Sequence, residues 1–321
     1  MAIVSSSQSV PFRRRRKSLP KWLPKISGAF GALSPSLAAR LLAFIFTRPG
    51  RQKLPHWERD WLLQSAGQPL RLNSGLTIPI YEWRGFEPMA GVRDEAPLPT
   101  ILLVHGFGGR AGQMGGFAAP LVAAGYRVVS FDAPAHGASP GIRSSLPDML
   151  DVTQEVAAHH GPLAGVVAHS NGAAAVIAAL AQGMQAEKLA LLAPMPDVEA
   201  FLSRLAARLG FSPRVADLTQ SRIEARYDLP FSALKAASLA PELSQSALIL
   251  QDADDQIVPL AEVEALARTT AQGPAIAIGS PWAEDGNLYN AYLILKDGRV
   301  ASKCLKHHLP NEMVFHEVRI F

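Results

Sequence analysis

Cysteine is almost absent from this chain of 321 residues, which has only Cys304. A single thiol cannot form a disulfide within the chain, so a disulfide-stapled secreted fold is excluded and a cytoplasmic location is expected. Long apolar runs are also missing, because the most apolar stretch, residues 28–46, is broken at residues 34–36 and at Arg40. A membrane-spanning helix is therefore not expected. The sequence has no nucleic-acid-binding motif, and we expect no nucleic-acid partner, no cofactor and no metal.

Acidic side chains are missing from the first 53 residues, which hold 11 of the 31 Lys and Arg residues. The remainder has 20 basic and 27 acidic residues, so the net charge of +4 divides into +11 and −7. Residues 13–17 form a run of five positive charges, which is either a solvated tail or a contact for anionic lipid or nucleic acid. Residues 28–46 are expected to form an amphipathic helix that packs on the domain or lies on a membrane surface. Peripheral membrane contact through residues 13–46 is the corresponding prediction.

Apolar runs of strand length alternate with helical segments over most of the chain, which is 48% hydrophobic. Strands are expected at residues 70–72, 77–83, 101–104, 127–131, 163–168, 189–192 and 247–250, and helices at residues 114–124, 146–160 and 261–271. This alternation predicts a mainly parallel sheet with helices on both faces. Residues 197–243 break the pattern with helical segments after the sixth strand. We expect them to form a lid over a site at the carboxyl ends of the strands.

Residues 163–175, LAGVVAHSNGAAA, join an apolar strand to an alanine-rich helix through Ser170. The motif is that of a nucleophile elbow, G-x-S-x-G, with Ala168 at the first glycine position and Gly172 at the second. Such a turn exposes the serine hydroxyl and leaves the N–H of the next residue, Asn171, free to bind an oxyanion. A buried strand with an incidental serine is the alternative, and the neighbouring motifs decide against it.

Three further motifs occur in the order expected around such an elbow. His105-Gly106-Phe107-Gly108-Gly109 follows the strand at 101–104, FDAPAHG occupies residues 131–137, and QDADDQIVP occupies residues 251–259. With these motifs, residues 70–270 resemble the α/β hydrolases. The resemblance implies the α/β-hydrolase fold, a mainly parallel sheet flanked by helices with a lid between the sixth and seventh strands.

The same resemblance implies roles for individual residues. Ser170 would be the nucleophile, and Asp255, three residues before Val-Pro, the acid that orients the base. The N–H groups of Phe107 and Asn171 would form the oxyanion hole, in which each donor contributes about 3 kcal/mol to catalysis. Asp197, after the sixth strand, is either an alternative acid or the N-cap of the first lid helix.

The general base is missing from its usual position. The eighth strand is expected near residues 275–278, and the resemblance places a histidine shortly after it. No histidine occurs between Asp255 and His307, and only His307, His308 and His316 follow the acid. His308 is taken as the candidate base and His307 as its alternative. Without a base, the serine hydroxyl stays protonated and weakly nucleophilic.

About 45 residues at the C-terminus resemble a different family, the nitrilase-type carbon–nitrogen hydrolases. The matching phrases are IGSPW at 278–282, LYNA at 288–291, KHHLPN at 306–311 and VFHE at 314–317. They are closest to the glutaminase part of glutamine-dependent NAD synthetase. The resemblance matches Lys306 to the lysine of a Glu-Lys-Cys triad, whereas the glutamate and cysteine of that triad lie outside this piece. Cys304 does not match the catalytic cysteine, so no glutaminase activity is expected of the tail.

The tail carries its own structural prediction. Residues 289–305 are expected to form an appended β-hairpin that turns at residues 297–298. We infer a gene fusion at about residues 271–275 that replaced the end of a hydrolase.

The expected organisation has three parts. These are a basic tail with an amphipathic helix (1–54), an α/β-hydrolase domain (55–272, lid 197–243) and a nitrilase-like partial segment (273–321). The expected function is that of a serine hydrolase acting on carboxylic esters or similar small-molecule acyl substrates through an acyl-enzyme, impaired by the replaced histidine segment. A catalytically inactive hydrolase-fold fusion or binding protein is the first alternative, and a remnant of a carbon–nitrogen hydrolase is the second.

Overall fold

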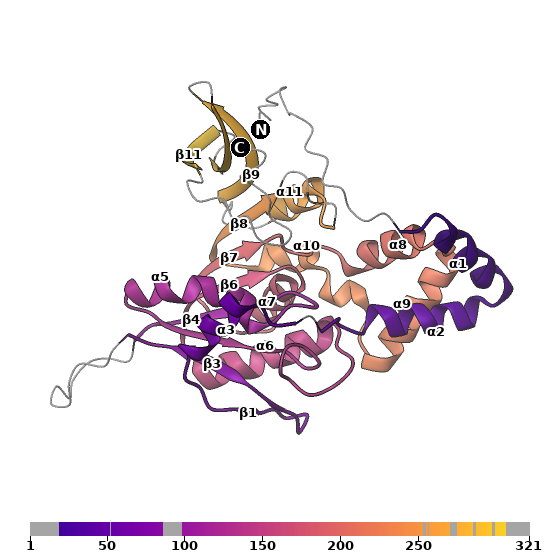
Figure 1. The fold of residues 1–321 in the computed structure, drawn as a ribbon, viewed down its shortest axis with the longest axis horizontal. Coiled ribbons are helices and arrows are strands. Elements are labelled where there is room, and N and C mark those ends of the chain that lie inside the picture. The colour runs from indigo at the N-terminus through magenta and orange to yellow at the C-terminus, as the bar shows by residue number, and fades with distance from the viewer. Residues whose placement is uncertain are drawn as a thin grey trace.

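The structure, a computed structural model, describes residues 19–51, 53–85, 98–252, 255 and 257–269, and the backbone of residues 275–284, 287–296 and 299–305. Its strands are β1 (Leu70–Arg71), β2 (Thr77–Ile78), β3 (Ile80–Trp83), β4 (Thr100–Val104), β5 (Arg127–Phe131), β6 (Leu163–His169), β7 (Lys188–Leu192), β8 (Ser246–Asp252), β9 (Ala275–Glu284), β10 (Asn287–Lys296) and β11 (Arg299–Leu305). Within the described residues, nine of them form one sheet in the order β11-β10-β9-β8-β7-β6-β4-β5-β3 (Figure 1). The strands from β5 across to β9 pair in parallel, and β3, β10 and β11 are antiparallel. The predicted mainly parallel sheet is confirmed.

Helices flank the sheet because its central strands are apolar on both faces. All five residues of β4 are buried, as expected for a parallel strand covered from two sides. The flanking helices are α3 (His56–Leu63), α4 (Ala111–Met114), α5 (Ala118–Ala123), α6 (Leu146–His160), α7 (Asn171–Ala181) and α11 (Leu260–Thr269). The single helix predicted at 114–124 is wrong in one respect, since a 3-10 turn at Gly115–Phe117 separates α4 from α5. Gly115 packs there against Trp61, where a Cβ would lie 2.8 Å from the Trp61 Cβ.

The predicted lid lies between β7 and β8. It consists of α8 (Val198–Arg208), α9 (Pro213–Tyr227), the 3-10 turns η2 (Phe231–Leu234) and η3 (Ala240–Glu242), and α10 (Ala236–Leu239). The N-terminal segment forms two helices, α1 (Trp22–Leu33) and α2 (Pro35–Phe46), so the expectation of one helix over 28–46 is wrong. Pro35 causes the break, because a proline disfavours the helical conformation in the preceding residue and suits the first turn of a new helix. Figure 1 shows α2 lying along α9 of the lid.

The C-terminal segment completes the hydrolase sheet. Residues Ala275 to Gly279 of β9 pair in parallel with Leu248 to Asp252 of β8, which confirms the predicted eighth strand. β9 continues to Glu284, and β10 and β11 extend the sheet as the predicted hairpin, with strand ends at Lys296 and Arg299. The part of the chain that resembles a different family therefore begins within the sheet.

Candidate active site

The strand, turn and helix predicted around Ser170 are present, and the turn is strained. Ser170 connects β6 to α7 with φ 53° and ψ −121°, a conformation that a non-glycine residue rarely adopts. Its N–H donates to the Leu192 carbonyl at 2.9 Å, and its own carbonyl accepts from Ala173 at 3.0 Å. Gly172 permits the close approach of helix and strand, because a Cβ there would lie 2.3 Å from the carbonyl oxygen of His105. The surrounding structure holds Ser170 at the carboxyl end of the sheet.

The loop after β4 forms a type II turn beside this serine. The N–H of Gly109 donates to the Gly106 carbonyl at 2.9 Å, and Gly108, in the third position of the turn, has the positive φ of 74° that the turn requires. Gly106 lies against Ser170, since a Cβ there would be 3.0 Å from the Cβ of that residue. Phe107 follows Gly106 and lines the same pocket as Ser170.

The second oxyanion donor predicted from the sequence is the N–H of Asn171. Asn171 is the first residue of α7, and the first N–H groups of a helix have no partner within it. They also lie at the positive end of the helix dipole. The backbone of α7 therefore offers donors directly after Ser170, as the sequence predicted.

Two buried histidines, His105 and His136, contact the loop after β4. The N–H of Ala133 donates to Nε2 of His105 at 3.0 Å, and Nδ1 of the same ring lies 2.8 Å from the Gly106 carbonyl. Burial lowers the pKa of His105 and of His136 to about 4, so both rings are neutral at pH 7. The His136 ring meets the Phe107 ring edge-on at 5.2 Å. This contact supports the side chain of Phe107, whose N–H is the first predicted oxyanion donor.

The loop after β5 contributes a buried carboxylate. Asp132 accepts hydrogen bonds from the N–H groups of Ala111 at 2.7 Å and Ala138 at 2.8 Å, and from the Tyr81 hydroxyl at 3.2 Å. Burial raises the pKa of Asp132. This side chain links its own loop to the start of α4, directly after the loop that follows β4.

Asp255 stands in the loop after β8, as predicted. Its Oδ1 accepts from the N–H groups of Ile257 at 2.7 Å and Val258 at 3.1 Å. The lid fixes this loop, because Arg204 of α8 donates to the Ile257 carbonyl at 3.4 Å and pairs with Glu262 of α11. No local sequence pattern indicates this link between lid and loop.

Asp197, the alternative acid, caps the first lid helix instead. Its Oδ1 accepts from the N–H of Ala200 at 2.9 Å, and its Oδ2 lies 2.5 Å from Nζ of Lys235. Both contacts lower the pKa of this carboxyl, against the effect of its partial burial. Asp197 therefore holds α8 in place. The predicted cap is the interaction that the structure shows.

The candidate base and the nitrilase-like lysine, His308 and Lys306, lie outside the described residues. The nearest described element before them is β11, which stands five positions from β6 in the sheet. Five strand spacings amount to about 24 Å.

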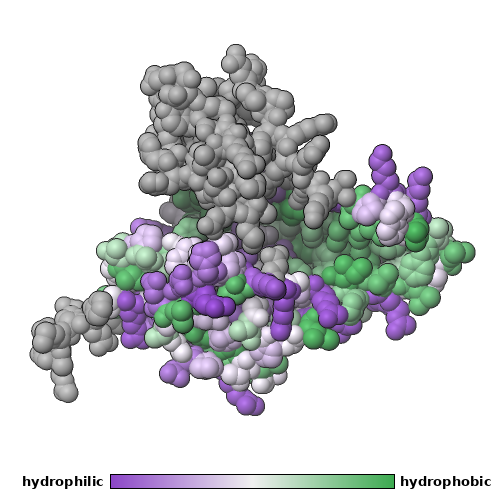
Figure 2. All heavy atoms as spheres, in the orientation of Figure 1, coloured by the Kyte–Doolittle hydropathy of each residue, from purple (hydrophilic) through white to green (hydrophobic). Residues whose placement is uncertain are grey.

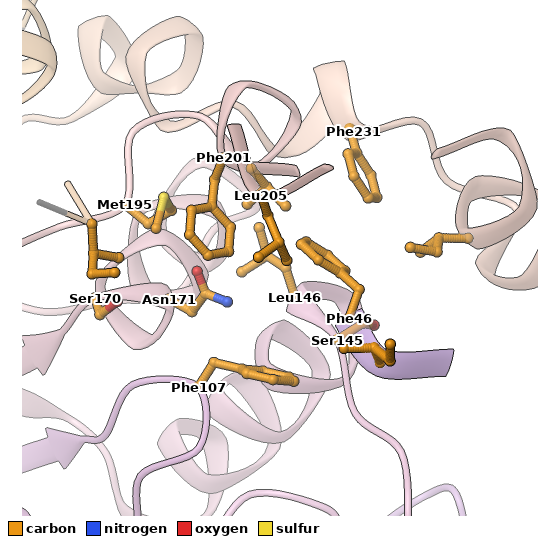
Figure 3. Close-up of a pocket in the computed structure, with 14 residues that line it drawn as sticks. Phe46, Phe107, Ser145, Leu146, Ser170, Asn171, Met195, Phe201, Leu205 and Phe231 are labelled. Carbon is orange, nitrogen blue, oxygen red and sulfur yellow. The ribbon is translucent and has the colours of Figure 1, made fainter. Parts of the chain in front are cut away.

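An apolar cavity of about 220 Å³ opens at Ser170. Figure 3 shows Ser170 at one end of it, Phe107 along one wall and Phe201 and Leu205 of α8 opposite. Asn171 and Ser145 are the other polar residues on the wall. The cavity can hold an apolar group next to the serine hydroxyl.

The helical hairpin formed by α1 and α2, called the N-terminal hairpin below, contributes to this cavity. Sequence reasoning missed this contribution. Ile45 and Phe46, at the end of α2, line the wall, and the Phe46 ring lies 6.0 Å from the ring of Phe201. The burial of Ala38, Ala39 and Leu42 against the lid brings them there. The three residues share one helical face, but the sequence does not indicate which surface that face covers.

Fold and site together define an α/β hydrolase. The model of the alpha/beta hydrolase family matches residues 101–313, more than half of the chain, and the chain belongs to that family. Two structures of the esterase Pf2001 of Pyrococcus furiosus share the fold. One is 16% identical with a TM-score of 0.50 and covers 71% of this chain and 86% of the other. The second is 14% identical with a TM-score of 0.52, covering 73% and 88%.

The C-terminal resemblance is confirmed as well. The glutamine-dependent NAD(+) synthetase of Rhodobacter capsulatus is 48% identical over 62 residues. The match covers 19% of this chain and only 11% of the synthetase.

Proposed function

We propose that this chain is a serine hydrolase that cleaves carboxylic esters or related acyl compounds through an acyl-enzyme. The observation that carries the proposal is the position of Ser170, which stands in a strained elbow at the end of an apolar cavity. The strain would have little purpose in a purely structural turn. The cavity is smaller than the roughly 300–1,000 Å³ of common ligand pockets, which favours a single acyl chain over a bulky acyl group.

In the proposed reaction, Oγ of Ser170 attacks the acyl carbon and its proton passes to the base. The oxyanion that forms accepts hydrogen bonds from the N–H groups of Phe107 and Asn171. The base then protonates the departing alcohol, and water cleaves the acyl-enzyme to release the acid. Asp255 orients the base and stabilises its positive charge.

His308 is the base in this proposal, and it must reach Ser170 from the far side of the sheet. His308 is the third residue after Leu305, the end of β11, and three extended steps of the chain span about 10 Å. Twist and coiling of the sheet must therefore bring the end of β11 back toward the acid loop. His307 is the alternative base under the same condition.

A binding protein that retains the cavity is the second candidate function. The observation that favours it is the absence of histidine from positions 256–306 of the sequence, where the family's base would stand. Such a protein would hold an acyl ligand beside Ser170 without turning it over.

Hydrolysis of a chain-length series of p-nitrophenyl esters tests the proposal. The full chain should turn over the esters, with loss of activity in Ser170→Ala and a large decrease in His308→Ala. His316→Ala is a matched control from the same tail and should retain activity. Turnover that survives Ser170→Ala would contradict the proposed nucleophile. Saturable binding of a fatty acid without any turnover would favour the binding protein.

A further inference from the structure

The N-terminal hairpin exposes a stripe of large apolar side chains. Its members lie on one face of each helix, at spacings of four and seven residues on α1 and of four residues on α2. They are 45–86% exposed: Trp22, Ile26 and Leu33 on α1, and Leu37, Leu41 and Ile45 on α2. Figure 2 shows the apolar colour over much of the hairpin and the adjoining lid. Single exposed leucines are common, whereas a contiguous series of this size on a soluble protein indicates an interaction surface.

The opposite face of the hairpin is fully occupied by the lid. Leu42 and Ala39 are buried, and the Thr219 hydroxyl of α9 reaches the Ala39 carbonyl at 3.4 Å. A Cβ at Gly31 would lie 3.2 Å from the Phe211 ring. The hairpin is therefore anchored through its inner face, and the outer stripe is not needed for its packing.

The charged side chains of the hairpin itself are of one sign. Residues 1–53 contain 11 basic and no acidic residues. Lys25 and Arg40 are exposed within the stripe, and the Arg48 guanidinium lies over the Phe44 ring at 5.2 Å. An apolar face on helices whose own charged side chains are all basic complements a bilayer of anionic lipid, in which apolar side chains enter the interface and basic ones meet the headgroups. Among the described residues, the helices are too short or too polar to cross a bilayer.

We propose that the α1–α2 hairpin docks this protein on the surface of an anionic lipid bilayer. The stripe ends at Ile45, which is both exposed and part of the cavity wall. Docking thus places the mouth of the cavity at the lipid surface, where acyl chains are the available ligands. That last consequence rests on the proposed function, whereas docking itself does not.

Sedimentation of the full chain with vesicles tests the docking. Vesicles of phosphatidylcholine alone are compared with vesicles of equal parts phosphatidylcholine and phosphatidylglycerol. The chain should bind the anionic vesicles, and Leu33→Gln with Leu37→Gln should weaken binding by at least about tenfold. The matched control is Leu63→Gln with Leu98→Gln, two exposed leucines outside the hairpin, which should bind as the unaltered chain does.

Charge and catalysis are tested separately. Lys25→Gln with Arg40→Gln should lower affinity for the anionic vesicles by roughly 25-fold and change binding to neutral vesicles little. Ser170→Ala should bind the vesicles as the unaltered chain does. A failure of the proposed catalytic function would therefore be distinguishable from a failure of docking. Equal sedimentation of the Leu33/Leu37 variant and the unaltered chain would overturn the proposal. So would a dimer in the absence of lipid that the same leucine substitutions convert to a monomer.

Discussion

The buried ion pair between Glu58 and Arg110 supplies the sharpest prediction for stability. Arg110 follows the glycine-rich loop after β4, and Glu58 lies on α3, which packs against α4. The two side chains are only 8% and 5% exposed, with Nε–Oε2 at 2.5 Å and Nη2–Oε1 at 3.0 Å. Removal of Glu58 takes away the carboxylate that pairs with the buried guanidinium, and breaking a buried ion pair in this way destabilises a protein by about 3–5 kcal/mol. Glu58→Ala should therefore lower the melting temperature by about 10 °C.

A matched control is available in the lid. Arg204 and Glu262 also form an ion pair, but their side chains are 37% and 28% exposed. Solvent screening limits such a pair to about 1 kcal/mol, so Glu262→Ala should shift the melting temperature by only a few degrees. Both variants are compared with the unaltered chain by circular dichroism during heating. Equal shifts for Glu58→Ala and Glu262→Ala would refute the reasoning.

Three further predictions concern the site. Gly172→Val should abolish the folded elbow, seen as loss of soluble protein, because its Cβ would overlap the carbonyl oxygen of His105; a soluble, active variant would contradict this. Phe46→Ala should move the preferred acyl chain of an ester series to greater length, since it removes a cavity wall beside Phe201, and an unchanged preference would exclude that wall. Burial lowers the folded-state pKa of His105 and His136 to about 4, so the stability that depends on their neutral rings is complete above about pH 6.5 and is lost as the pH falls toward 4. The urea midpoint of unfolding should therefore fall between about pH 6.5 and about pH 4, and a constant midpoint over this range would contradict the prediction.

The positions of the main site elements follow from local sequence patterns. Ser170 and its turn are predictable because strand, small residues and helix all lie within a few positions of one another. Gly108 has the positive φ expected of a glycine in the short motif at residues 105–109. Asp197 is predictable in the same way, because it caps the helix that begins at the next residue. In each case the determining contacts are close in sequence.

The features that the sequence did not predict depend on distant contacts. Phe46 reaches the cavity only because α2 packs on α9, about 180 residues further along the chain. The buried ion pair of Glu58 and Arg110 is likewise not predictable from the sequence, since the residues around one of them do not indicate the other as its partner. Lid and hairpin together form a surface that no local pattern specifies. The break of the predicted N-terminal helix at Pro35, in contrast, was readable from the proline itself.

Labelling of the full chain with a fluorophosphonate, followed by peptide mass spectrometry, tests the central claim most directly. The reagent forms a covalent bond only with an activated serine, and the account predicts one adduct, on Ser170, that is absent from Ser170→Ala and reduced in Asp255→Asn. A folded chain that gives no adduct on Ser170, or an adduct on a different serine, would contradict the account.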